Sequence, residues 1–329
     1  MKTLTVGVTA VAGVIVALMV LAALTAKPAQ ANGVVGTGTP ASCTEGALDH
    51  ALAGGGSVTF DCGASPFTLA VTTTKTIAAD TNIDGGDLVT LDGGGTVQIL
   101  IVNPETTLSL FNVTISGGRG ADGVSAWPHI SPAGSAITNS GTLYVIDSTL
   151  SGNSGGSGDL YGYDSSPGGS AITNSGTLDV AGSTFSGNTG GSGGDGGAGG
   201  PGGSTIANSG TLYLNNSTLS GNTGGGGGGG DFPGPGGSGA IVAYGGTLYV
   251  INSTFSGNAG GNGGAGDPVG PGGNGAILAS GGTVMIGNTI VADNTSPNCG
   301  GDLPPFSGPL IMRVQPQCSS LAHAGRREP

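Results

Sequence analysis

Apolar and polar residues alternate in short stretches that recur every 34 to 36 residues along most of the chain. In Thr142 to Ile146, Leu143 and Val145 would face one side and Thr142 and Tyr144 the other, which is the two-residue period of a half-buried strand. The stretch is too short for an amphipathic helix. The same alternation returns at four later places: Leu178/Val180, Leu212/Leu214, Leu248/Val250 and Val284/Ile286.

Two more short apolar stretches accompany each of these strands. One carries Ile137, Ile172, Ile206, Ile241 and Ile277, and another carries Leu150, Phe185, Leu219, Phe255 and Ile290. A fixed period in this range indicates stacked units, none of which can bury its apolar face alone. Three strands per repeat predict one coil of a parallel β-helix, with equivalent residues stacked in columns about 4.8 Å apart.

Several of these columns are polar. An asparagine ends each repeat, at Asn153, Asn188, Asn222, Asn258 and Asn294. Asparagine tolerates the left-handed conformation of a tight corner, and stacked side-chain amides bond to one another, so we expect a structural column there. Tyr144, Tyr213 and Tyr249, interrupted by Asp179, would form an outward column, interpreted either as cross-coil packing or as a sugar-binding strip.

The part of the chain before the regular repeats is less uniform. Ile77, Ile83, Val89, Leu91, Val97, Ile99, Ile101, Leu108, Leu110, Val113 and Ile115 mark short strands, and two glycine-containing segments, at 84–86 and 92–95, mark turns. Residues 44–52 predict a short helix with Thr44 as N-cap, which would cover the open end of the solenoid.

The ends of the chain predict export. Lys2, an apolar run from Val6 to Ala26 and Ala29-Gln30-Ala31 resemble a secretory signal over residues 1–31, with an uncleaved membrane anchor as the alternative. Four cysteines allow three pairings, and proximity favours Cys43 with Cys62 and Cys299 with Cys318, as disulfides of an oxidising compartment. We therefore expect a secreted or cell-surface protein.

Charge narrows the set of partners. Beyond residue 32 there are 19 acidic residues against five basic ones, a net charge of about −14. Such a surface repels phosphate backbones, which argues against nucleic acid as a partner. A polysaccharide, or a host or cell surface, remains as the expected class of partner. Contact with a membrane would require that the N-terminal segment is not cleaved.

Two motifs carry a resemblance to a known family. Phe185-Ser186-Gly187-Asn188 and Phe255-Ser256-Gly257-Asn258 match Phe-x-x-Asn, and Gly239-Ala240-Ile241 and Gly275-Ala276-Ile277 match most of Gly-Gly-Ala-Ile. Over about residues 40 to 296 the chain resembles the bacterial right-handed parallel β-helix proteins of the pectin-lyase-like superfamily, with repeats similar to those of polymorphic outer-membrane proteins. The apolar pattern along the chain predicts a cap with first strands over 32–74, a solenoid over 75–296 and an irregular Pro-containing tail over 297–329.

Glycine-rich loops separate the coils, at 154–169, 189–203, 223–238 and 259–274. Two interpretations are open: a flexible fringe, or extended polyglycine- or polyproline-like rods packed in register. An aspartate recurs at this edge, at Asp122, Asp159, Asp195, Asp231 and Asp267. Such a column either holds Ca²⁺ between coils or forms a solvated acidic stripe, and we favour the stripe, with no cofactor.

Catalytic candidates are few. Lyases of the superfamily that this chain resembles use an Arg or Lys base with clustered carboxylates. Here the one chemically varied loop, 117–134, contains Arg119, Asp122, Trp127 and His129. We expect a non-catalytic protein with an adhesive or structural role. A carbohydrate-active protein that uses the 117–134 loop is the alternative. Binding of ice or a crystal surface through threonine columns is a remote one, at Thr142, Thr177, Thr211, Thr247 and Thr283 and at Thr149, Thr184, Thr218, Thr254 and Thr289.

Overall fold

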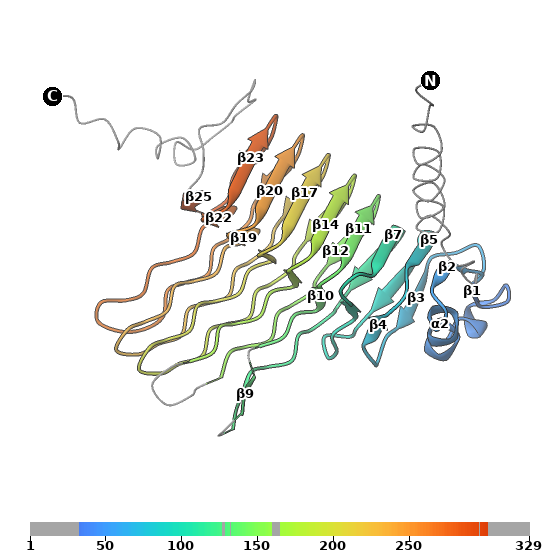
Figure 1. Ribbon diagram of the computed structural model, residues 1–329, viewed down its shortest axis with the longest axis horizontal. Coiled ribbons are helices and arrows are strands. Elements are labelled where there is room, and N and C mark those ends of the chain that lie inside the picture. The colour runs from blue at the N-terminus through green and yellow to red at the C-terminus, as the bar shows by residue number, and fades with distance from the viewer. Residues whose placement is uncertain (1–32, 127–128, 132, 160–164, 296, 302–329) are drawn as a thin grey trace, which may run out of the picture.

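The strands of successive repeats lie side by side and run parallel, so the chain forms the predicted all-β parallel solenoid (Figure 1). The computed structural model describes residues 33–126, 129–131, 133–159, 165–295 and 297–301. The predicted signal segment and most of the tail lie outside these residues. Among the described residues, no helix is long and apolar enough to cross a membrane.

Each repeat contributes three strands to three parallel stacks. The first stack contains β10 (Ile137–Asn139), β13 (Ile172–Asn174), β16 (Ile206–Asn208), β19 (Ile241–Tyr244) and β22 (Ile277–Ser280). The second contains β11 (Thr142–Ile146), β14 (Thr177–Ala181), β17 (Thr211–Asn215), β20 (Thr247–Ile251) and β23 (Thr283–Gly287). The third contains β12 (Thr149–Ser151), β15 (Thr184–Ser186), β18 (Thr218–Ser220), β21 (Thr254–Ser256) and β24 (Ile290–Ala292).

The N-terminal part contains β1 (Gly33–Val35), η1 (Pro40–Ser42), α2 (Glu45–Leu52), β2 (Gly56–Phe60), β3 (Phe67–Ala70), β4 (Lys75–Ile77), β5 (Thr81–Asp92), β6 (Leu100–Val102) and β7 (Thr107–Ser116). Strand β7 pairs with β11 through its first half and with β12 through its second half, so one long strand divides into two stacks. The expected turn at 84–86 is instead an irregularity within β5, where the register against β7 shifts.

The predicted helix is present as α2. The Thr44 Oγ1 accepts a hydrogen bond from the Ala47 amide at 3.2 Å, and Leu48 and Ala51 are buried. Figure 1 shows α2 at the N-terminal end of the stack.

An ion cluster fixes α2 to the first coil. The ammonium of Lys75, whose side chain is 3% exposed, lies 2.7 Å from the Glu45 carboxylate and 2.6 Å from that of Asp49. Backbone amides of Thr72 and Thr73 also donate to Glu45, each at 2.9 Å. Burial acts to raise the pKa of Glu45, but Lys75 and the two threonines outweigh it, and this pKa lies far below its ordinary value.

The interior follows the predicted alternation. Leu143, Leu178, Leu212 and Leu248 pair in register and are fully buried, as are Phe185 and Phe255. The last repeat corrects the prediction by one residue, because Phe255 pairs with Val291 and not with Ile290. Val291 is buried and Ile290 is exposed. In the same register Thr289 lies opposite Ser253, so it belongs to the column of Ser148, Ser183, Ser217 and Ser253 and not to the predicted threonine column.

The asparagine column forms a buried ladder, as expected. The amide Nδ2 atoms of Asn153, Asn188, Asn222 and Asn258 each donate to Oδ1 of the next asparagine, at 2.8 to 3.1 Å. The expected left-handed backbone lies elsewhere, at Gly152, Gly187, Gly221, Gly257 and Asp293, one residue earlier, and at a corner occupied by Asp147, Gly182, Asn216, Asn252 and Asn288. The side-chain ladder therefore accounts for the asparagine at these positions.

The C-terminal boundary extends beyond the predicted residue 296. Strand β25 (Cys299–Gly301) pairs with β22 and continues the first stack. The disulfide between Cys43 and Cys62 is present, with the Cα atoms 5.6 Å apart. Cys299 is also disulfide-bonded, and its predicted partner Cys318 lies outside the described residues.

Candidate functional site

The glycine-rich loops form an ordered array, which makes the flexible-fringe interpretation wrong. In its described residues, each loop leaves the solenoid as one extended limb and returns as another, and Figure 1 shows the limbs of successive coils running side by side. Among these residues, β-pairing is confined to isolated bridges such as Thr189 with Thr223. The other limb residues are held by a different pattern of hydrogen bonds.

That pattern has a period of three residues. Gly190 and Gly193 donate their amides to carbonyls of the next loop, Thr223 and Gly226, at 2.8 Å each. Gly191 and Gly194 donate in another direction, to Gly169 and Ser166 of the preceding loop, at 2.8 and 3.0 Å. The third residue of each triplet, Ser192 or Asp195, is exposed. Three residues per turn without internal hydrogen bonds describe polyproline II geometry, so the limbs are packed rods.

The rods are joined across the two limbs by one continuous zigzag. Gly203 donates to Gly191, Gly191 to Gly169, Gly169 to Gly156, and Gly156 to Gly134, all at 2.8 to 3.0 Å. The chain of bonds therefore runs up the solenoid and crosses between the limbs at every step. We call this array the glycine lattice.

The close approach of neighbouring backbones explains why the loops are rich in glycine. A Cβ atom at Gly191 would overlap the carbonyl oxygen of Gly156, and one at Gly203 would overlap that of Gly169. At Gly226, an outward position, the nearest atom would lie 3.7 Å away. Two positions of each triplet are thus closed to side chains and the third is open.

The aspartates of this edge do not form the predicted column. The coils pair through Arg119, Ser154, Thr189, Thr223 and Ala259. Counted from these residues, the aspartates lie three, five, six, eight and eight places further on, at Asp122, Asp159, Asp195, Asp231 and Asp267. Unequal coil lengths cause this drift, which the constant sequence spacing conceals. Within the described part of the chain, no group of three or more acidic, His or Cys residues is placed to hold a metal.

A groove with two cavities lies where the glycine lattice meets the first strand stack. Two cavities of about 560 and 320 Å³ share Pro201, Gly202, Val242 and Tyr244. Their floor follows one register column: Thr173, Ala207, Val242 and Leu278. One wall contains Pro167, Pro201 and Pro235, and the lining also includes Ser209, Tyr244 and Ser280. We call this feature the axial groove. No repeated sequence pattern predicts it, although Tyr244 interrupts the repeated signature.

The 117–134 loop does not assemble a catalytic pair from the residues described. The Arg119 guanidinium lies 2.6 Å from the Asp122 carboxylate. The same Asp122 carboxylate accepts a hydrogen bond from the Ser157 amide of the next coil at 2.8 Å. His129 belongs to β9 (His129–Ser131), which pairs antiparallel with β8 (Val124–Ala126). The side chain of His129, like Trp127 as a whole, lies outside the described residues.

The outward tyrosine column is present on the second strand stack. Tyr144, Asp179, Tyr213, Tyr249 and Met285 pair in register. The rings of Tyr213 and Tyr249 stack with centroids 5.0 Å apart and an interplanar angle of 4°. A cavity of about 240 Å³ beside them also contacts Asp179.

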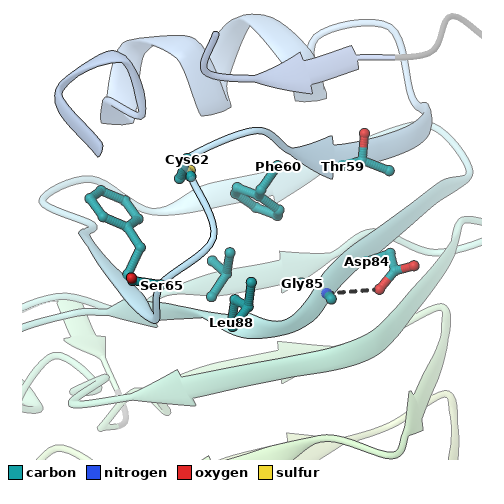
Figure 2. Close-up of a pocket in the computed structure, with 11 residues that line it drawn as sticks. Thr59, Phe60, Cys62, Ser65, Asp84, Gly85 and Leu88 are labelled. Atoms are coloured by element: carbon teal, nitrogen blue, oxygen red, sulfur yellow. Dashed lines mark hydrogen bonds between the residues drawn. The ribbon is translucent and has the colours of Figure 1, made fainter. Parts of the chain in front are cut away.

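A smaller cavity lies near the disulfide. Figure 2 shows Phe60 on the side of β2 and Leu88 on the side of β5, with Asp84 nearby. The Asp84 carboxylate accepts bonds from the Gly86 amide at 3.0 Å and the Asn112 amide group at 3.2 Å. At about 160 Å³ this cavity is below the range of ordinary ligand sites.

No protein-family model, curated protein or solved structure matches this chain.

Proposed function

We propose that this chain is an exported, non-catalytic solenoid that works by presenting a long, rigid surface, with an adhesive or structural role outside the cell. The observation that carries the proposal is that, among the described residues, the two basic side chains that could serve as a lyase-type base are paired with carboxylates. Lys75 holds Glu45 and Asp49, and Arg119 holds Asp122. A general acid or base must be free to exchange a proton with a substrate.

Export rests on the N-terminal sequence and on the cysteines. The Cys43–Cys62 disulfide is typical of an oxidising compartment. The right-handed coil and the pectin-lyase-like relationship belong to this proposal too, on the strength of the Phe-x-x-Asn and Gly-Ala-Ile motifs.

The axial groove supports a second candidate, binding of an extended polysaccharide without cleavage. The groove follows the solenoid axis over several coils, so it matches a linear polymer better than a compact ligand. Tyr244 is 52% exposed and offers an aromatic surface of the kind that packs against a sugar.

A polysaccharide array combined with an assay for unsaturated or reducing products tests both candidates. We expect binding without turnover, and loss of binding in Tyr244→Ala. Arg119→Ala serves as the control, since it should leave binding unchanged. Turnover by the wild-type protein that disappears in Arg119→Ala would refute the non-catalytic proposal.

A further inference from the structure

The tyrosine column is interrupted at one place by a carboxylate. Asp179 pairs in register with Tyr144 on one side and with Tyr213 on the other. All three side chains point outward, because the alternating Leu178 and Val180 point into the core. Aspartate is shorter than tyrosine, so the column is lower at Asp179 than at the tyrosines on either side. We call this break the slot; Asp179 and Tyr213 both line the cavity of about 240 Å³ described above.

The Asp179 carboxylate is half-buried and unsatisfied. Among the described residues it has neither a hydrogen-bond partner nor an ion-pair partner. Burial raises the pKa of Asp179. The lysine and arginine of the described chain, Lys75 and Arg119, are paired with other carboxylates. A partly desolvated carboxylate of this kind gains free energy when a cation from outside reaches it.

The strand spacing suits an organic cation. Neighbouring strands lie about 4.8 Å apart, so Tyr144 and Tyr213 are separated by about twice that distance. A cation midway between them lies about 5 Å from each ring, inside the limit of about 6 Å for an attractive cation–π contact. Its charge then rests above Asp179.

The surroundings favour a protein over a sugar as the source of that cation. Tyr213 stacks face to face on Tyr249, so this pair does not offer the successive open ring faces that a sugar strip requires. Further along the same face, Ile251, which lines the cavity beside Asp179, and Met285 are about half exposed. Tyrosine and methionine are enriched at protein interfaces.

We propose that Asp179, Tyr144 and Tyr213 form a binding site for an arginine or lysine side chain presented by a basic protein partner. The surface charge is complementary, since the whole chain carries a net charge of −12. This inference rests on the proposed adhesive role and names basic proteins as the class of partner for it. It concerns a different face from the axial groove.

The test measures binding of an acetylated and amidated Gly-Arg-Gly peptide to the full-length protein. Asp179→Asn removes the charge, and Asp179→Tyr fills the slot while completing the aromatic column. Each should weaken binding about tenfold or more, with unchanged thermal unfolding. Asp231→Asn is the charge-matched control and should bind like wild type, and Tyr244→Ala should also bind like wild type, which separates this site from the axial groove.

Three outcomes would overturn the proposal. Equal weakening in Asp179→Asn and Asp231→Asn would mean attraction by net charge alone. Asp179-dependent binding of a glucosamine hexamer without binding of the peptide would assign the slot to an amino sugar. A gain of peptide affinity in Arg313→Gln would mean that the chain's own arginine occupies the site.

Discussion

The Asn188 Oδ1 accepts two hydrogen bonds from Asn153, one from its backbone amide at 3.0 Å and one from its side-chain Nδ2 at 3.1 Å. The Nδ2 of Asn188 in turn reaches back to the Leu150 carbonyl at 2.9 Å and forward to Asn222 at 3.0 Å. Each such side chain thus satisfies two backbone groups of the preceding coil and bonds to the asparagine side chain of the next. The ladder joins coils through the interior, where an unpaired polar group would be costly.

Asn222→Ala should destabilise the fold strongly. The change leaves the Asn188 backbone amide, the Asn188 Nδ2 and the Phe185 carbonyl without their present partner. We expect a loss of about 3 kcal/mol in the free energy of unfolding, measured by denaturant titration. Asn215→Ala, at an exposed position of β17, should cost less than about 0.5 kcal/mol. Similar losses in the two variants would contradict the ladder.

Gly191→Ala should disturb the glycine lattice, while Gly226→Ala should not. The added methyl group overlaps a backbone carbonyl at Gly191 and meets open space at Gly226. Thermal unfolding should show a loss of about 1–3 kcal/mol for the first and a change within about 0.5 kcal/mol for the second. Equal tolerance of both substitutions would mean that the loops are not packed rods in solution.

A chelator should leave the melting temperature unchanged. Of the recurring aspartates only Asp231 and Asp267 share a place in the register, and the described residues contain no group of three or more acidic, His or Cys side chains placed to hold a metal. A drop of more than about 3 °C with EDTA that disappears in Asp195→Asn with Asp231→Asn would demonstrate a bound Ca²⁺ and refute this prediction.

Acid should loosen the attachment of α2. A carboxyl group whose pKa is lowered by folding stabilises the folded state above its unfolded pKa, and this contribution is lost as the pH falls towards the folded pKa. Glu45 is such a group, so its contribution should be complete above the ordinary value of 4.5 and decline below it. Glu45→Gln should lower stability at pH 7 and flatten the pH profile below 4.5. An unchanged profile would show that Glu45 is not the group responsible.

Much of the fold could be predicted because the same strand pattern recurs in every repeat of a solenoid. The alternation at Leu143 and Val145 predicts which side chains of the strand face the core, and its recurrence in later repeats predicts which residues of neighbouring strands pair. The last coil was the exception, since Thr289 and Ile290 resemble the threonine and apolar positions but are displaced by one residue.

The candidate sites were less predictable, because they depend on contacts between coils of unequal length. Regular spacing of the aspartates suggested a column that the register does not form. The pairing of Arg119 with Asp122, and the slot at Asp179, depend on side-chain positions that periodicity does not specify. For the glycine-rich loops, the sequence left two interpretations open, a flexible fringe and packed rods. A high glycine content is compatible with disorder as well as with close packing, so it does not decide between them.

The zigzag of the glycine lattice has a consequence for how such a chain changes over generations. Each loop donates amides to a row of carbonyls on the preceding loop, and its own equivalent carbonyls accept the amides of the next loop. A repeat that is added or removed therefore needs no new geometry. A change of length within one limb would shift its triplets against both neighbours, although loops of 15 and 16 residues do stack on one another. Selection should accordingly preserve the register of the limbs while it allows the number of coils to vary.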